Sequence, residues 1–361
     1  MTDGLLDQAD PLDAHDAVPM ERLRPWLTDV LGQVPGDITL ARFGRGYSNL
    51  TFLVTVDGRE LVLRRPPPGV RIAKAHDMGR EHRIVSAIGT VWDKVPPTVA
   101  VCTDPDVLGG DFYLMERVSG MILRRDPPRS LTHGPSDWGR ASQALVDTLT
   151  EIHAIDIAAA GLDGLGRPEG YVTRQVQGWT RRYEASATDD LPAVHRLAEW
   201  LAAHQPAESG ARLIHNDLKY DNAIVNPDDL GDVRAVLDWE MATIGDPLLD
   251  LGTFLAYWVQ ADDPPVLQHL RMGPTQLPGN LTRTELVERY QARTEQSFDP
   301  LWYYAFGQFK NAVVVQQLYR RYVEGHTKEA RYAGFLDGVK GLAAVGLGAI
   351  RQGHIGALGA S

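Results

Sequence analysis

The stretch that decides the fold reads HNDLKYDN over residues 215–222, and VLDWE follows it over residues 236–240. Asp217 and Asn222 supply carboxylate and carboxamide oxygens within one short loop, and Asp238 follows an apolar run sixteen positions after Asn222. Such oxygens are the ligands that Mg²⁺ prefers. The stretch therefore predicts a loop whose side-chain oxygen atoms bind Mg²⁺. The alternative is a surface loop whose Asp and Asn side chains only form turns.

The eight residues also match the His-x-Asp-x-x-x-x-Asn pattern of the catalytic loop in protein-kinase-like enzymes, where an aspartate after the next strand binds metal. Phosphoryl transfer depends mainly on positioning the reactants and neutralising the triphosphate. In this interpretation Asp217 is the base that orients an acceptor hydroxyl group and takes its proton. Lys219 reaches the transferred phosphoryl group, and Asn222 and Asp238 bind Mg²⁺.

Further segments extend the match along the chain, at residues 43–49, 62–69, 80–83, 112–118 and 237–251. With them the chain resembles the aminoglycoside-phosphotransferase family, also called the choline/aminoglycoside kinase-like group, from about residue 20 to near the C-terminus. It is most similar to the branch that occurs alone in bacteria or fused ahead of acyl-CoA dehydrogenase domains.

The resemblance implies an α+β, protein-kinase-like bilobal fold with ATP or GTP bound between the lobes. A small antiparallel β N-lobe with one helix would precede a larger, mainly α C-lobe. We expect a flexible N-terminal tail over residues 1–18, the N-lobe over residues 19–118, and the C-lobe with the catalytic loop over residues 119–361.

The resemblance also implies the residues that contact the nucleotide. Residues 44–49 would form the phosphate-covering turn, and residues 115–118 the hinge strand that reads the adenine edge through its backbone. Arg64 departs from the family pattern, because kinases have a lysine there; arginine keeps the charge but is bulkier. Glu81, on the following helix, would pair with Arg64. The full expected set is Ser48, Asn49, Val62, Arg64, Glu81, Glu116 and Val118.

Local patterns predict the secondary structure. Asp57-Gly58 is a strong two-residue hairpin signal between two alternating runs. We expect strands over residues 49–56, 60–64, 99–103 and 112–118. Helices are expected over residues 20–31, 76–88, 136–158 with a serine N-cap, 170–187 and 193–204, and a strand-loop-strand region over residues 212–237.

Composition narrows the class of protein. The net charge of −11 argues against broad nucleic-acid or anionic-membrane binding, which needs a basic surface. The single cysteine, Cys102, excludes an internal disulfide and fits the cytoplasm. The apolar run over residues 341–350 is too short to span a bilayer and predicts a buried helix. Oligomeric state, monomer or homodimer, stays open.

The leading interpretation is an ATP- or GTP-dependent kinase that acts on a small hydroxylated acceptor, either a metabolite or an antibiotic-like molecule. The alternative is a nucleotide-binding pseudokinase that regulates a partner, which only Arg64 supports. A protein kinase is disfavoured, because only eleven residues separate Asp238 from Asp250. The aromatic residues of the last third of the chain are either core or the lining of an acceptor pocket: Tyr257, Trp258, Trp302, Tyr303 and Tyr304.

Overall fold

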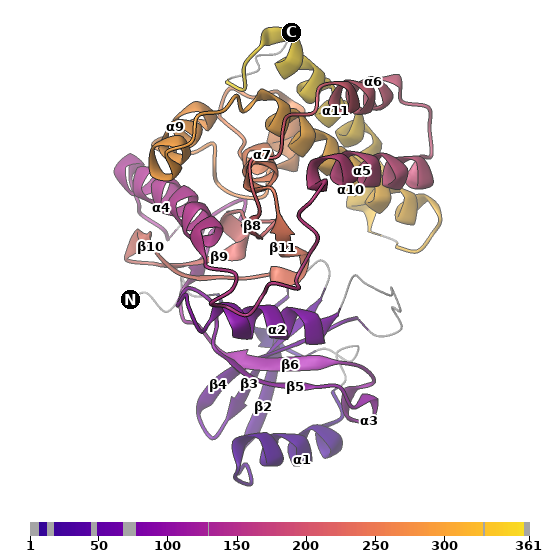
Figure 1. Cartoon of the computed structure of the whole chain (residues 1–361). Coiled ribbons are helices and arrows are strands. Elements are labelled where there is room, and N and C mark those ends of the chain that lie inside the picture. Colours follow the sequence, from indigo (N-terminus) through magenta and orange to yellow (C-terminus); the bar gives the residue numbers. More distant parts are fainter. Residues whose placement is uncertain are drawn as a thin grey trace.

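The computed structural model describes residues 7–12, 18–44, 49–67, 77–128, 130–327 and 329–356. A small lobe built on a sheet lies at one end of the molecule, and a larger helical lobe lies at the other (Figure 1). The chain passes from one lobe to the other after strand β6, Phe112–Glu116. The α+β class and the bilobal arrangement expected from the sequence are confirmed.

The small lobe contains a six-stranded antiparallel sheet in the order β1-β2-β3-β4-β6-β5. Helix α1, Met20–Leu31, buries Leu23 and Leu27 against the sheet, while α2, Met78–Ile88, lies on the opposite side, toward the large lobe (Figure 1). A third, four-residue helix, α3, covers Pro105–Leu108. The remaining strands are β1 Asp10–Pro11, β2 Ile38–Arg42, β3 Leu50–Val56, β4 Arg59–Arg65 and β5 Thr98–Cys102.

The hairpin between β3 and β4 forms where the sequence predicts it. Asp57 and Gly58 have φ values of 51° and 85°, the left-handed conformations that a tight two-residue turn needs. Strand β2 escaped prediction because its five residues, ITLAR, are short and only weakly alternating. Pairing with β3 along its whole length supplies the order that the local pattern does not.

Residues 7–12 correct the expectation of a flexible tail. Asp10 pairs with Arg42 in the short strand β1, at the edge of the sheet. The backbone N–H of Asp7 donates to the carbonyl of Gly120 at 3.2 Å, and its carboxylate lies 2.9 Å from Arg124. This segment therefore joins the edge of the sheet to the connection between the lobes.

The large lobe is mainly helical. Its helices are α4 Pro135–Ala154, α5 Tyr171–Ser186, α6 Pro192–Ala203, α7 Pro247–Tyr257, α8 Pro265–Leu270, α9 Arg283–Thr294, α10 Leu301–Val323 and α11 Phe335–Gln352. Its strands are β7 Met121–Ile122, β8 Arg212–Ile214, β9 Ala223–Asn226, β10 Asp229–Val236 and β11 Thr243–Gly245, which form the two small sheets β10-β9-β7 and β11-β8.

Helix α4 begins two residues earlier than it would with the expected serine cap, Ser136. Gly134 is the N-cap, and Pro135 occupies the first turn, where its missing N–H is not needed. The carboxylate of Asp137 accepts from the N–H of Gly134 at 2.8 Å. Ser136 therefore lies inside the helix and is not its cap.

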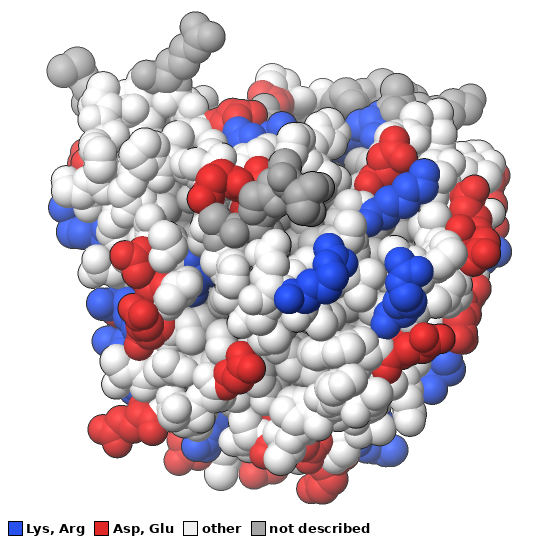
Figure 2. Space-filling view, turned by 90° about the horizontal axis from the view of Figure 1, so that it is seen from above, with Lys and Arg blue, Asp and Glu red and all other residues white. Residues whose placement is uncertain are grey.

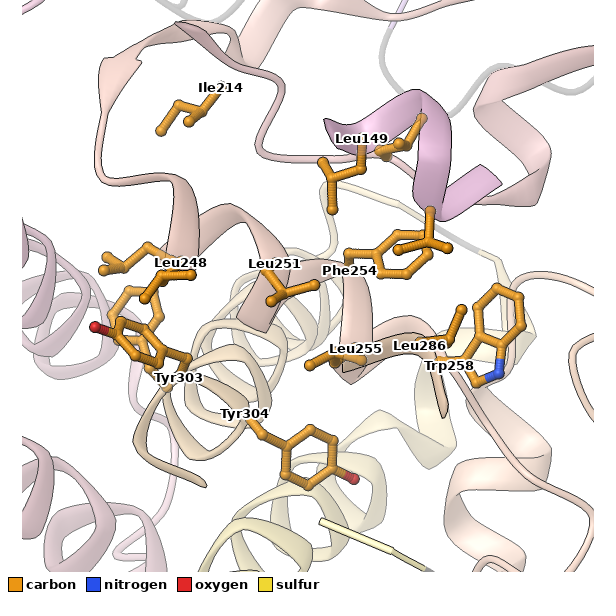
Figure 3. Packing of buried hydrophobic residues seen from close by; sticks show 14 of the residues in the cluster. Leu149, Ile214, Leu248, Leu251, Phe254, Leu255, Trp258, Leu286, Tyr303 and Tyr304 are labelled. Atoms are coloured by element: carbon orange, nitrogen blue, oxygen red, sulfur yellow. The ribbon is translucent and has the colours of Figure 1, made fainter. Parts of the chain in front are cut away.

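Helix α7 forms the centre of the large lobe's core. Its residues Leu251, Phe254 and Leu255 contact the surrounding helices on several sides, and Tyr303 and Tyr304 of α10 pack beside it (Figure 3). Four of the five late aromatics are thus core, namely Trp258, Trp302, Tyr303 and Tyr304. Tyr257 is the exception and belongs to the site described below.

One helical stretch, Arg331–Gln352, is long and apolar enough to cross a membrane by length and composition alone. Helix α11 within it packs on α10 and α6 and buries Val339, Leu342 and Ala343, as expected of a core helix.

The face of the large lobe seen from above carries both signs of charge in a mixed pattern, without a continuous basic patch among its coloured residues (Figure 2).

Candidate active site

The predicted catalytic loop connects β8 to β9, and Asp250 on α7 fixes its start. The carboxylate of Asp250 accepts from the backbone N–H groups of His215 at 2.7 Å and Asn216 at 2.8 Å. His153 lies 3.2 Å from the same carboxylate. Burial raises the pKa of Asp250, but the hydrogen bond and charge of His153 outweigh burial and hold that pKa below its ordinary value.

His215 supports the loop from inside. Its Nε2 lies 3.0 Å from the carbonyl of Leu237, and its Nδ1 accepts from the backbone N–H of Asp217 at 3.2 Å. These two bonds fit a neutral imidazole that donates from Nε2. Burial lowers the pKa of His215, which favours the same neutral form. His215 therefore ties the loop to the strand that leads to Asp238.

Three donors hold the carboxylate of Asp217. Tyr257 donates to Oδ1 at 2.8 Å, while Lys219 and Asn222 donate to Oδ2 at 2.5 and 2.9 Å. Burial raises the pKa of Asp217, but the charge of Lys219 and these hydrogen bonds outweigh it and lower the pKa. Asp217 is therefore ionised at neutral pH and fixed in orientation.

Asn222 and Asp238 lie close together on adjoining backbone segments. The backbone N–H of Leu237 donates to the carbonyl of Asn222 at 2.8 Å. Asp238 has φ 67° and ψ 58°, a left-handed conformation that is uncommon outside glycine and that turns the chain sharply at this point. Because Asn222 donates to Asp217 through its amide nitrogen, its amide oxygen points the other way.

These oxygens fit a bound Mg²⁺. Magnesium in nucleotide sites usually takes one or two protein ligands and completes its shell with phosphate oxygens and water. Asn222 and Asp238 provide this number of hard ligands. Among the residues that the structure describes, no group of three His, Cys, Asp or Glu side chains could hold a metal ion unaided.

Arg64 of β4 connects α2 to Asp238. Its Nε lies 3.3 Å from the carboxylate of Glu81, and its guanidinium group also pairs with the carboxylate of Asp238. Glu81 is 1% exposed, and burial raises its pKa to about 7 although Arg64 opposes that shift. The predicted pairing of Arg64 with Glu81 is thus present, and it extends across the lobes to the expected metal ligand.

Two of the other expected nucleotide residues, Asn49 and Val62, lie directly before β3 and in the neighbouring strand β4. Asn49 donates to Glu240 across the lobes at 2.9 Å. Val62 packs with Met78, Tyr113 and Met115 in a cluster separate from the main core. Ser48 lies outside the described residues.

The hinge strand ends at Glu116. Its backbone N–H donates to the carbonyl of Pro97 at 2.8 Å, and its side chain pairs with Arg59 at the surface. Val118 follows in the connection between the lobes and lies outside any strand. The role of Glu116 and Val118 in nucleotide binding stays a prediction.

Two groups beside Asp217 were not connected with it from the sequence; Tyr257 had only been expected in the core or in the lining of an acceptor pocket. Tyr257 ends helix α7 forty residues away from Asp217 in sequence, and no local pattern connects the two. Asp221 lies 3.7 Å from Lys219, and burial raises its pKa to about 6 despite that charge. Lys219 therefore lies between two carboxylates, which raise its pKa against the effect of burial.

Comparisons with known proteins agree with this geometry. The model of the phosphotransferase enzyme family (APH) matches residues 39–285. Acyl-CoA dehydrogenase family member 10 of Mus musculus is 34% identical over 326 residues, covering 89% of this chain and 30% of that protein. Acyl-CoA dehydrogenase family member 11 of Homo sapiens is 34% identical over 314 residues, covering 86% and 40%. The chain thus spans less than half the length of these relatives.

Solved structures share the whole fold. A candidate aminoglycoside phosphotransferase from Ralstonia eutropha has a TM-score of 0.78 and 28% identity, covering 93% of this chain and 99% of that one. Aminoglycoside 2'-phosphotransferase-IIIa, solved as a GDP complex, has a TM-score of 0.59 at 15% identity, covering 90% and 98%. The kinase-like fold and the resemblance drawn from the sequence are confirmed: the chain belongs to the phosphotransferase enzyme family.

Proposed function

We propose that the chain is a small-molecule kinase that transfers the γ-phosphoryl group of ATP or GTP to a hydroxyl group. The observation that carries this proposal is the carboxylate of Asp217. Tyr257, Lys219 and Asn222 all donate to it, at 2.5 to 2.9 Å, and the two expected metal ligands lie beside it. A binding module has no need of an ionised carboxylate fixed in this way.

The residues divide the work of transfer. Asp217 accepts the proton of the acceptor hydroxyl group as that oxygen forms its bond to the γ-phosphorus. The bond between the γ-phosphorus and the β–γ bridging oxygen breaks, and the nucleoside diphosphate leaves. Asn222 and Asp238 would hold Mg²⁺, which neutralises phosphate charge when bound. Lys219 and Arg64 place positive charge at the same side of the loop.

The relatives support the nucleotide and leave a choice of acceptor. Aminoglycoside 2'-phosphotransferase-IIIa has been solved with GDP and with kanamycin, so this fold binds a nucleotide and a hydroxylated small molecule together. The curated relatives, by contrast, are described as acyl-CoA dehydrogenase family members. Their names favour a metabolite over an antibiotic as the acceptor of this chain.

The alternative is a pseudokinase that binds nucleotide and regulates a partner. The ion pair between Arg64 and Asp238 is the observation that favours it, because the guanidinium group occupies one side of the expected metal ligand. In an active kinase, Mg²⁺ and the nucleotide phosphates have to compete with that pairing.

Thermal unfolding with nucleotide separates these outcomes. A ligand that binds only the native state stabilises it by ~2.7 kcal/mol at a hundredfold excess over its Kd. We expect ATP or GTP to raise Tm in wild type, more with Mg²⁺ than without it, and Asp238→Asn to weaken the Mg²⁺-dependent part. Asp232→Asn, an exposed change on β10, is the matched control. Equal shifts with and without Mg²⁺ would leave nucleotide binding but remove the metal assignment, and absence of any shift would contradict the kinase.

A further inference from the structure

A pocket lies beside the catalytic loop, and Met241 and Thr243, from the segment after Asp238, also line it. Helices α5 and α10, which run next to each other, form its walls (Figure 1). Tyr171, Trp179 and Arg182 line it from α5, and Phe306 and Lys310 line it from α10. The loop residue Asn216, which directly precedes Asp217, forms part of the remaining wall. The pocket therefore adjoins the catalytic loop at the residue before the proposed base.

The charged side chains that line this pocket are all positive. Its lining includes two cationic side chains, Arg182 and Lys310, and no acidic one. The guanidinium carbon of Arg182 lies 4.5 Å from the ring centroid of Trp179, which holds it at the rim by a cation–π contact. None of the described carboxylates forms an ion pair with Arg182, and the charges that act on it are those of Arg181 and Tyr171. Its positive charge is available to a ligand.

Two residues that line the pocket have hydrogen-bond donors without partners among the described residues. Lys310 is 5% exposed and donates to the carbonyl of Asn216 at 2.8 Å and to the hydroxyl of Thr253 at 3.3 Å. An ammonium group carries three N–H bonds, so one remains. Trp179 is 6% exposed, and its indole N–H has no partner among the described residues. Buried donors without partners are costly, and acceptor atoms of a ligand would satisfy them.

The size of the pocket limits what fits. Its volume is about 140 Å³, room for roughly five water molecules at ~30 Å³ each. Pockets that enclose a whole drug-sized ligand measure roughly 300–1,000 Å³. The pocket therefore takes one end group and leaves the rest of the ligand outside.

We propose that this pocket, the cationic pocket, binds an oxyanion end group of the acceptor, a carboxylate or a phosphate ester, while the acceptor's hydroxyl group faces Asp217. The inference rests on the proposed kinase function and names its substrate class. Lys310 contacts the main chain one residue before Asp217, so an anion bound there keeps the acceptor within a few bonds of the base. A polycation such as an aminoglycoside would instead meet Arg182 and Lys310 with charge of the same sign.

The first test uses wild-type protein saturated with Mg²⁺ and ADP, so that added phosphate cannot occupy the nucleotide site. Inorganic phosphate and 3-hydroxybutyrate are compared at constant ionic strength with chloride, with the uncharged 3-hydroxybutyramide and with kanamycin. We expect the two oxyanions to raise Tm with a saturable concentration dependence and the amide and kanamycin not to do so. The larger of the two oxyanion shifts identifies the end group as carboxylate or phosphate.

The second test places the effect in the pocket. Arg182→Gln removes the rim charge, and Arg181→Gln removes the same charge from the neighbouring exposed residue as the matched control. We expect the apparent Kd for the oxyanion to rise about tenfold or more in Arg182→Gln and less than twofold in Arg181→Gln. Lys310→Met should abolish the effect, and Arg182→Gln keeps the test valid if that buried change prevents folding.

The outcomes separate this inference from the kinase proposal. A normal Mg²⁺–ADP shift without any oxyanion shift, equal losses in Arg182→Gln and Arg181→Gln, or a larger shift with kanamycin would each overturn the cationic pocket and leave the kinase intact. If Mg²⁺–ADP gives no shift, the kinase proposal fails. An oxyanion shift that disappears in Arg182→Gln would then still establish the pocket.

Discussion

The two sides of the catalytic loop differ in charge. On the side of the small lobe, the carboxylates of Glu81, Asp217, Asp221 and Asp238 gather around Arg64 and Lys219. The ion-pair distances are 3.3 Å from Arg64 to Glu81, and 2.5 and 3.7 Å from Lys219 to Asp217 and Asp221. On the other side, the cationic pocket has Arg182 and Lys310 and no acidic lining. Asn216, one residue before Asp217, is the catalytic-loop residue that lines this pocket.

This difference indicates how each side handles a negatively charged ligand. Carboxylates next to a triphosphate require a metal ion between them, and the paired, oriented acids of the first side suit that arrangement. Unpaired cations require no metal and bind an anion directly. In the two proposals, the catalytic loop therefore takes part in a metal-dependent anion site and in a metal-independent one.

The largest expected effect comes from removing the proposed base, Asp217, on the side of the small lobe. Asp217→Asn keeps the shape of the side chain and removes the base, so turnover should fall by ~10²- to 10⁴-fold. Nucleotide and oxyanion affinity should change little, because neither ligand depends on proton uptake by Asp217. Coupled detection of nucleoside diphosphate measures turnover, and thermal shift measures both affinities. Turnover near the wild-type value would remove Asp217 from its assigned role.

Most of the first side was predictable from the sequence, because its residues lie in compact motifs. Asp217, Lys219 and Asn222 share one loop. Asp238 follows β10, whose antiparallel pairing with β9 returns the chain to Asn222. The pairing of Arg64 with Glu81 required the kinase-like resemblance, and its extension to Asp238 required the structure. The hairpin at Asp57-Gly58 was local and was predicted correctly.

The cationic pocket was not predictable in the same way. Arg182 and Lys310 lie 128 positions apart on two helices, and each is surrounded by ordinary helical sequence. The late aromatics showed the same limit, because helical spacing does not distinguish core from site. Four of them proved to be core, whereas Tyr257 contacts Asp217. Strand β2 and the segment over residues 7–12 also depend on pairing between distant residues.

The next effect sharpens the role of Tyr257. Tyr257→Phe removes the donor to Oδ1 of Asp217, a bond that helps to lower the pKa of Asp217. That pKa should rise, so the acid limb of the kcat/KM profile should move to higher pH. Losing one hydrogen bond to a charged group, about 1.4 kcal/mol, corresponds to roughly a tenfold loss of kcat/KM. Tyr322→Phe, on the last turn of α10, is the control. An unchanged acid limb would show that the hydroxyl group of Tyr257 does not help to set the pKa of Asp217.

A third effect tests the cationic pocket through the pH dependence of its affinity for an oxyanion. Burial lowers the pKa of Lys310 to about 8, against the effect of Asp217 and Asp250 and with that of Lys219 and Arg182. Lys310 is therefore charged below about pH 8 and loses its charge as the pH rises through that value. We expect oxyanion affinity to fall severalfold between pH 7 and pH 9, measured by thermal shift.

The lowered pKa of Lys310 also predicts how the free energy of unfolding changes with pH. Between about pH 8 and the ordinary lysine value of 10.5, the unfolded chain binds the proton that native Lys310 has lost. The contribution of Lys310 to the free energy of unfolding therefore rises with pH in that window. Lys310→Met should remove this rise, and Lys340→Met, at an exposed residue of α11, should not. Oxyanion affinity that is flat across pH 8 would contradict the assigned role of Lys310.

The smallest effect concerns the contact that joins the small lobe to the first side. Asn49 donates to the carboxylate of Glu240, two residues after Asp238, and Asn49→Ala should cost ~0.5–1.5 kcal/mol in the free energy of unfolding. Asn226→Ala removes a comparable bond to Asp232 at an exposed hairpin and is the control. Denaturant titration measures the loss of stability. The oxyanion-dependent Tm shift should be the same in both variants, because neither Asn49 nor Glu240 lines the cationic pocket; a weakened shift in Asn49→Ala alone would mean that the contact between the lobes is coupled to the pocket.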